Sequence, residues 1–128
     1  MIRVYVKKLT SCPVSAPKVK RSLKEILTKE GIVSKADVTV SFVGRKYMLN
    51  LVNKYLKENV LHDVLTFPNL EGDQGFIEPP DDIIHLGDII ICYPRVVKEA
   101  SHEGKLIDDK VLELISHGAL HLMGKHHE

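Results

Sequence analysis

Three histidines near the carboxyl end of the chain have a spacing that fits one metal ion. They are His117, His121 and His127, in the frame His-x3-His-x2-Gly-x2-His. On an α-helix, His117 and His121 would lie one turn apart with their Cβ atoms roughly 5–6 Å from each other. In a continuous helix, His127 would be displaced by about 9 Å along the axis from His121. The helix must therefore end before His127, and Gly124 favours that end because glycine adopts the left-handed conformation that reverses the chain.

The ligand types predict the ion and its chemistry. Three neutral imidazoles without a cysteine favour one zinc ion, although nickel, copper and iron are compatible with the same ligands. Three protein ligands leave a fourth position for water, as in catalytic zinc sites. We therefore expect zinc-activated water to attack the substrate. No general base can be assigned: His62, Asp63, His85 and Asp88 are candidates because they fall near expected strand ends, but each such residue is more often structural than catalytic.

Metzincin peptidases share this histidine spacing and provide one alternative. Their motif places glutamate, the general base, directly after the first histidine. Here that residue is Gly118, which cannot transfer a proton. Metzincins also require a Met-turn downstream, whereas this sequence stops at Glu128. A zinc peptidase is therefore the least favoured interpretation.

The composition fits an ordinary globular domain. Of 128 residues, 44% are hydrophobic and 27% charged, so we expect a single domain over residues 1–128. No apolar run approaches the ~20 residues that span a bilayer, and the amino terminus lacks a signal-peptide layout. We therefore expect a cytoplasmic location and no membrane partner. Cys12 and Cys92 are far apart in the sequence and predict neither a disulfide nor a cysteine zinc site.

The net charge of +1 hides an asymmetry between the two halves of the chain. Residues 1–60 hold 13 Lys and Arg against 4 Asp and Glu, a net charge of +9, and residues 61–128 hold 5 against 13, a net charge of −8. A basic half suits a polyanion such as a nucleic acid. It is also compatible with a solvated face that binds nothing.

The hydrophobic periodicity predicts the elements that must position these residues. Strands are expected over residues 2–6, 37–43, 64–67 and 84–92, the last covered on both faces because it is almost entirely apolar. Helices are expected over 15–30, 45–57, 93–103 and 108–123, and a long exposed loop over 69–82. This order predicts an α+β fold, one layered domain with a small mixed sheet of about four strands and a metal-binding helix across it.

Several segments together resemble the bacterial YbeY family. They are Leu49-Asn50 followed by Tyr55, Asp63 to Pro68, Leu86 to Ile91, and the histidine frame. The resemblance implies that His117, His121 and His127 bind zinc, with a zincin-like metal helix near the carboxyl terminus. It also implies a zinc-dependent single-strand endoribonuclease of the cytoplasm, active in 16S rRNA maturation, small-subunit assembly and ribosome quality control. The implied partners are rRNA in the small ribosomal subunit, ribosomal proteins and an assembly GTPase.

The chain departs from the family at three positions. Leu56 stands where the family usually has an arginine thought to matter for activity, His126 where an aspartate is common, and His62 where a threonine is usual. Lys54 or Lys57 can supply the missing charge and are the candidate substrate-binding residues, although lysine lacks the two-pronged reach of arginine to phosphate. Leu56 keeps one alternative open, a non-enzymatic ribosome-assembly factor whose metal is structural.

Overall fold

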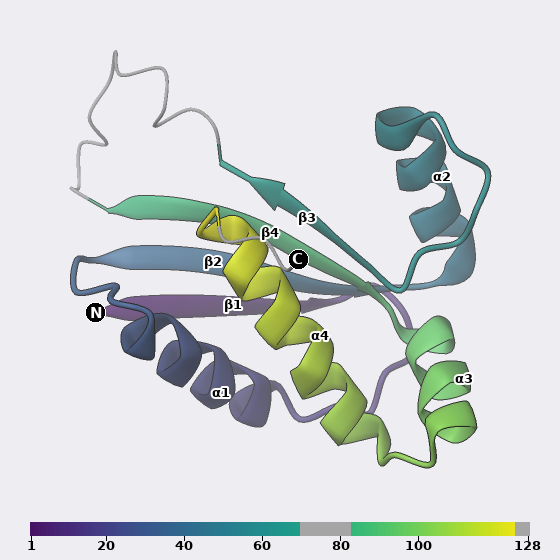
Figure 1. The fold of residues 1–128 in the computed structure, drawn as a ribbon, viewed down its shortest axis with the longest axis horizontal. Helices are drawn as coiled ribbons and strands as arrows, with labels where there is room; N and C mark the ends of the chain where they lie inside the picture. The colour runs from purple at the N-terminus through teal and green to yellow at the C-terminus, as the bar shows by residue number, and fades with distance from the viewer. Residues whose placement is uncertain (70–82, 125–128) are drawn as a thin grey trace.

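Four strands and four helices make up the part of the chain that the computed structural model describes, residues 1–69 and 83–124 (Figure 1). In chain order they are β1 (Ile2–Lys8), α1 (Ala16–Lys29), β2 (Ala36–Val43), α2 (Arg45–Leu56), β3 (Val64–Pro68), β4 (Ile84–Cys92), α3 (Tyr93–Glu103) and α4 (Ile107–Leu122). Each element lies where the sequence predicts it, with ends that differ by at most two residues. The predicted α+β fold with a small mixed sheet is confirmed.

β3 is the antiparallel edge of an otherwise parallel sheet. The strand order is β1-β2-β4-β3, in which β1 pairs parallel with β2, β2 parallel with β4, and β3 antiparallel with β4. The register of the last pair places Thr66 opposite Ile89. Within the sheet that the structure describes, β3 therefore has a strand neighbour on one side only.

The helices cover the two faces of the sheet unequally. α1 and α4 lie on one face and bury the main core with it, whereas α2 lies on the other face (Figure 1). Val38 and Val40 of β2 point into the main core, so Asp37 and Thr39, which alternate with them, face the opposite side. A second, smaller core lies beneath α2, and its buried members are Val43, Met48, Val52 and Cys92.

Local signals set the ends of α1 as the sequence predicts. The hydroxyl of Ser15 accepts a hydrogen bond from the backbone N–H of Lys18 at 3.3 Å, which satisfies one of the free donors of the first turn. Pro17 lies in that turn, where its missing N–H costs nothing. Gly31 follows the last turn with a φ of 102°, a conformation that favours glycine.

β4 is not covered on both faces along its whole length, and that prediction is wrong for its first half. Ile84, His85 and Asp88 are exposed, whereas Ile89 to Cys92 are largely buried. α2 covers the second face only over the end of β4. The exposed half contains Gly87, at a φ of 133°, where an added Cβ would lie 2.2 Å from the carbonyl oxygen of Phe67. Only glycine fits this close approach of β3 to β4.

Two predicted features lie at least partly outside the described residues. The expected loop over 69–82 is described only at Asn69, and the frame of histidines is described as far as Gly124. In residues 1–69 and 83–124, no helix combines the length and apolarity that crossing a bilayer requires.

Candidate functional site

α4 carries His117 and His121 on one exposed flank. The two residues lie four positions apart in the helix, one turn, as the spacing predicts. Lys110 and Glu113 precede His117 by seven and four positions, so all four side chains share this flank. α1 packs against the other flank, beside Val111. The two histidines therefore face away from α1, on the β3 side of the helix.

A cluster of charged side chains lies near the start of α4, on the same flank as the histidines. Lys110 is buried, and its Nζ lies 2.9 Å from Glu103 Oε2 and 2.7 Å from Glu113 Oε2. The Nζ of Lys105 pairs with the other carboxylate oxygen of Glu113. Hydrogen bonds from Lys105 and Lys110 lower the pKa of Glu113 to about 2. This cluster joins the end of α3 to the start of α4 and so helps to set the direction in which the histidine flank faces.

α4 ends where a three-histidine site requires it to end. The backbone N–H of Met123 bonds the carbonyl of Ala119 at 3.2 Å, and that of Gly124 bonds the carbonyl of His121 at 3.0 Å. Gly124 has a φ of 75°, in the left-handed region that ends helices. Two imidazoles one turn apart, followed at once by a helix end, fit a metal ion that takes its third ligand from the next residues. His127 lies outside the described residues, so its role stays a prediction.

Gly118 packs directly against β4. A Cβ at this position would lie 3.0 Å from Cγ2 of Ile89 and 3.1 Å from its Cδ1 and Cγ1. Ile89 is fully buried. The glutamate that a metzincin places here would therefore start inside the core contact between α4 and the sheet. The structure adds a packing reason to the chemical one against the peptidase interpretation.

Two of the four candidate bases lie on the far face of the sheet from α4. His85 pairs with Asp37 and Asp88 with Thr39 across β2 and β4, and together they line a polar cavity of about 340 Å³. The Nδ1 of His85 lies 2.8 and 2.9 Å from the carboxylate oxygens of Asp37. Burial raises the pKa of Asp88, against the charge of Lys7, which lowers it. The sheet separates both residues from the histidine flank.

Asp63 belongs to a polar cluster at the start of β3. Its carbonyl accepts a hydrogen bond from the backbone N–H of Cys92 at 2.9 Å. Glu99 of α3 approaches its carboxylate, and burial together with that neighbour raises the pKa of Glu99. The Nε of Arg95 lies 3.3 Å from Glu99 Oε2. Sequence reasoning missed this cluster, although the spacing of Arg95 and Glu99 by four positions is a helical ion-pair signal.

The remaining candidates lie on and just after α2. The Nε2 of His62 lies 2.9 Å from Glu58 Oε1. Leu56, at the position of the family arginine, has 41% of its surface exposed. Lys54 and Lys57 are both exposed, and Lys57 caps the helix in the left-handed conformation. The structure thus brings Leu56, Lys54 and Lys57 together on the sheet face opposite α4.

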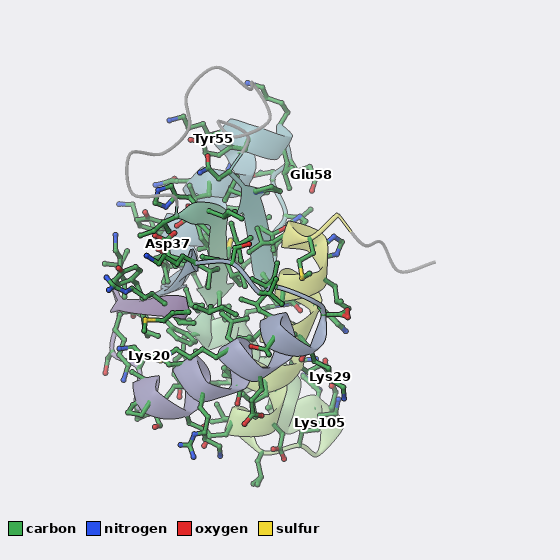
Figure 2. All side chains as sticks on the ribbon, turned by 90° about the vertical axis from the view of Figure 1, so that its left-hand side faces the viewer. Lys20, Lys29, Asp37, Tyr55, Glu58 and Lys105 are labelled. Carbon is green, nitrogen blue, oxygen red and sulfur yellow. The ribbon has the colours of Figure 1, made fainter. Side chains whose placement is uncertain are left out.

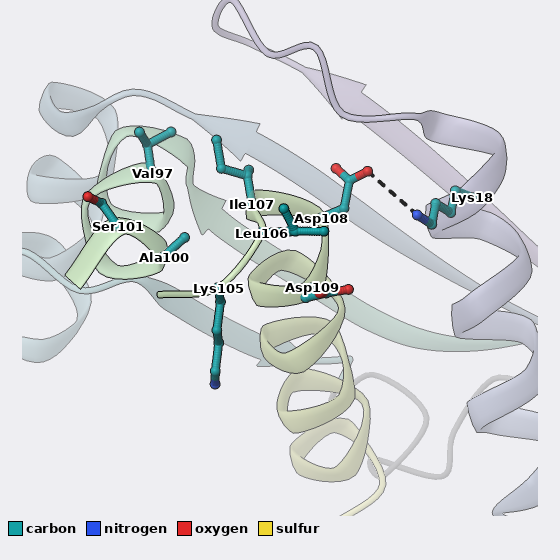
Figure 3. A pocket seen from close by; sticks show the side chains of 9 residues that line it. All are labelled: Lys18, Val97, Ala100, Ser101, Lys105, Leu106, Ile107, Asp108 and Asp109. Atoms are coloured by element: carbon teal, nitrogen blue, oxygen red, sulfur yellow. Dashed lines mark ion pairs between the residues drawn. The ribbon is translucent and has the colours of Figure 1, made fainter. Parts of the chain in front are cut away.

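One cavity lies apart from the histidines. It has a volume of about 540 Å³ and is bounded by α3, the turn into α4 and Lys18 of α1 (Figure 3). Lys18 Nζ lies 3.5 Å from Asp108 Oδ2 at its rim. Asp108 is in the first turn of α4, whereas His117 and His121 are in its second half. We therefore do not assign this cavity to the histidine site.

Comparisons with known proteins agree on one family. The family model for endoribonuclease YbeY matches residues 7–128. An endoribonuclease YbeY of Dehalococcoides mccartyi is 32% identical, over 99% of this chain and 84% of the relative. Proteins of the same name from Macrococcus caseolyticus and Thermus thermophilus are 35% and 32% identical, over 87% and 88% of this chain and 71% and 76% of the relatives.

A solved structure agrees with the fold as well. The solution structure of TM1509 from Thermotoga maritima aligns with a TM-score of 0.58 and 26% sequence identity, over 100% of this chain and 75% of that protein. The family model also spans the strand, helix and histidine segments described above. Because that model and relatives at more than 30% identity cover most of the sequence, the chain belongs to the endoribonuclease YbeY family.

Proposed function

We propose that this protein is a metal-dependent endoribonuclease that hydrolyses single-stranded RNA, with one zinc ion held by His117, His121 and His127. The observation that carries the proposal is the exposed pair His117 and His121, one turn apart on a helix that ends at Gly124, in a member of this family. Its biological setting, in this proposal, is the cytoplasm, where the enzyme acts in 16S rRNA maturation, small-subunit assembly and ribosome quality control. Its partners there are ribosomal proteins and an assembly GTPase.

The chain's own residues supply the rigidity that such a site needs. Two contacts hold α4 in place: Gly118 packs against Ile89 of the sheet, and Lys110 lies between the carboxylates of Glu103 and Glu113. The helix that carries the histidines is therefore held both by the sheet and near its own start. Neutral imidazoles leave the double positive charge of the ion intact. A zinc ion held there supplies Lewis acidity to water and to a phosphoryl oxygen.

The basic residues of α2 provide a way to hold the substrate. Lys54 and Lys57 are exposed, and α2 contains no acidic residue. Lysine binds phosphate as a point charge, so these side chains attract the RNA backbone without selecting a sequence. In this proposal they take part of the role of the arginine that Leu56 replaces.

RNA cleavage and metal content, measured on the same preparations, test the proposal. Untagged wild-type protein is expected to contain one zinc ion per chain and to cut a labelled single-stranded RNA. His121→Ala should lose both properties. His102→Ala is the matched control, because His102 is also an exposed helical histidine but lies on α3. Equal cleavage by wild type and His121→Ala would assign the activity to a contaminant and refute the proposal.

Leu56 favours a second candidate, a non-enzymatic factor for ribosome assembly with a structural metal. In that case His121→Ala would lower the free energy of unfolding while no preparation cuts RNA. Binding to the small ribosomal subunit would then persist in any His121→Ala protein that folds. A protein that cuts RNA only when it contains zinc would exclude this candidate.

A further inference from the structure

α2 presents an exposed surface of basic and aromatic side chains. Its buried residues are Met48 and Val52 alone, and no acidic residue occurs between positions 45 and 57. The exposed residues that could meet a polyanion form what we call the α2 surface, namely Arg45, Lys46, Tyr47, Lys54, Tyr55 and Lys57. Basic residues interleaved with aromatic rings are the composition that single-stranded nucleic acids require.

The basic amino-terminal half of the chain is divided between two surfaces by the sheet. Figure 2 shows Tyr55 at the α2 end of the molecule and Lys20 and Lys29 on α1 at the other end, with Asp37 of the sheet between them. α1 contains no aromatic residue. Charge alone makes both surfaces attractive to phosphate, but only the α2 surface adds rings that can stack on bases.

Tyr55 is held in a defined orientation although it is mostly exposed. Its side chain is 54% exposed, and its ring lies 5.1 Å from that of Phe67, edge to face at an interplanar angle of 63°. The Nζ of Lys54 lies 5.2 Å from the centroid of the same ring. Phe67 meets the Tyr55 ring at an angle and not as a parallel stack, and Tyr55 is more than half exposed, so a planar ligand can stack on the exposed part of its ring. The Lys54 ammonium lies over the same ring on a flexible stem, so it can turn towards a phosphate when a base takes its place on the ring.

A short series of contacts through β3 and β4 links Tyr55 to the histidine helix. Phe67, which supports Tyr55, follows Thr66 in β3, and Thr66 is paired with Ile89 of β4. Ile89 in turn lies beside Gly118, the residue after His117. Because β3 is an edge strand of the described sheet, one flexible polymer that passes around this edge can contact both α2 and α4 (Figure 1).

We propose that Tyr55 is a stacking platform for a nucleobase of single-stranded RNA, with Lys54 and Lys57 bound to the adjacent phosphates. This inference rests on the proposed function and extends it, because it names the surface that holds the substrate away from the cleaved bond. Every base has an aromatic face, so the platform binds single strands with little preference for sequence. A paired base cannot stack on Tyr55 unless it leaves its duplex, so the platform selects single strands.

A tryptophan reporter tests the stacking directly, because the chain contains no tryptophan. Tyr55→Trp places the only indole at the platform, and a short single-stranded RNA should quench its fluorescence on binding. Tyr5→Trp is the matched control, because Tyr5 is 47% exposed but lies on β1, at the opposite edge of the sheet. The same RNA should leave Tyr5→Trp unchanged. Absence of quenching in Tyr55→Trp while that RNA binds, or equal quenching in both variants, would overturn the proposal.

Affinity provides a second readout that does not depend on cleavage. Base–aromatic stacking contributes about 1–3 kcal/mol by alanine substitution, so Tyr55→Ala should weaken RNA binding by about 5- to 150-fold in fluorescence anisotropy. Tyr55→Phe, which keeps the ring, should bind within about twofold of wild type, and so should Tyr5→Ala. Lys54→Ala should reduce the salt dependence of binding, whereas Tyr55→Ala should not. Wild-type affinity in a folded Tyr55→Ala protein refutes the platform.

The two proposals fail in different ways. RNA that binds through Tyr55 but stays intact on a gel with every preparation supports the platform and refutes the nuclease. RNA that is cut with an unchanged KM by Tyr55→Ala supports the nuclease and refutes the platform. An RNA duplex that quenches Tyr55→Trp as strongly as the single strand would refute the single-strand selectivity.

Discussion

Replacing Gly118 with alanine tests how closely α4 is held on the sheet. The added Cβ would meet three carbon atoms of Ile89 at 3.0–3.1 Å. Carbon atoms attract best at about 3.5–4.0 Å, so each contact would be too short by about half an ångström. Ile89 is fully buried and its surroundings are close-packed. The strain must therefore be relieved by a shift of the Ile89 side chain against its packed surroundings or by a movement of α4 away from β4.

Two opposing effects set the expected change in the free energy of unfolding. Alanine is favoured over glycine inside a helix by about 1 kcal/mol. Overpacking a core costs about 1–3 kcal/mol, and three short contacts to one confined side chain place this case near the upper end. We expect Gly118→Ala to lower the free energy of unfolding by about 1–2 kcal/mol. That change corresponds to a fall in Tm of several degrees for a domain of this size.

Urea unfolding of four proteins, wild type, Gly118→Ala, Ile89→Val and the double variant, measures this effect. Ile89→Val removes Cδ1 and is expected to cost about 0.5–1.5 kcal/mol alone. In that background Gly118→Ala should cost less, because one of its three short contacts, that to Cδ1, is removed. If Gly118→Ala instead raises the free energy of unfolding by about 1 kcal/mol, the position is an open helical site and our reasoning about α4 is wrong.

Three further predictions concern other parts of the molecule. Lys105 and Lys110 lower the pKa of Glu113 from 4.5 to about 2, so the stability that Glu113 contributes is present above pH 4.5 and is lost as the pH falls towards 2. Glu113→Gln should therefore abolish this part of the pH dependence of the free energy of unfolding in urea, at most about 3 kcal/mol. An unchanged pH profile would contradict the assignment. Leu56→Arg should increase the rate of RNA cleavage several-fold relative to wild type and to the control Leu56→Gln. Because the side chain is 41% exposed, the free energy of unfolding should change by less than about 0.5 kcal/mol. An unchanged cleavage rate would show that the missing guanidinium does not limit activity. The two cysteine thiols are buried, and burial raises the pKa of each, so a thiol reagent at pH 7 should label them only after unfolding in urea; rapid labelling of both in the native protein would argue against their burial.

The hydrophobic periodicity and the residues that begin and end helices made most of the fold predictable. Strict alternation identified β2, and the apolar spacing between Ser15 and Gly31 identified α1 with both of its ends. These signals are local, because each depends on residues within one element. The burial of β4 could not be predicted in the same way, because its second face is covered only where α2 packs, and the length of that contact is a tertiary property.

The candidate site shows the same division between local and long-range information. The one-turn pair His117 and His121 and the helix end at Gly124 followed from spacing alone. The positions of the candidate bases did not, because the side of the sheet on which His85 and Asp88 lie depends on pairing with β2 across about fifty residues of sequence. The contact between Tyr55 and Phe67 likewise joins two elements and has no signal in either one.

The small core beneath α2 has a consequence for how the molecule fluctuates. Four buried side chains anchor α2, whereas α4 shares a core that extends over the whole sheet. Segments with few buried contacts open at lower free energies than the global unfolding reaction. Amide hydrogens of α2 should therefore exchange with solvent through a local opening, while those of α4 exchange only when the domain unfolds. α2, which we expect to bind RNA, can thus adjust to the shape of a single strand, while α4, which carries the histidines, stays fixed on the sheet.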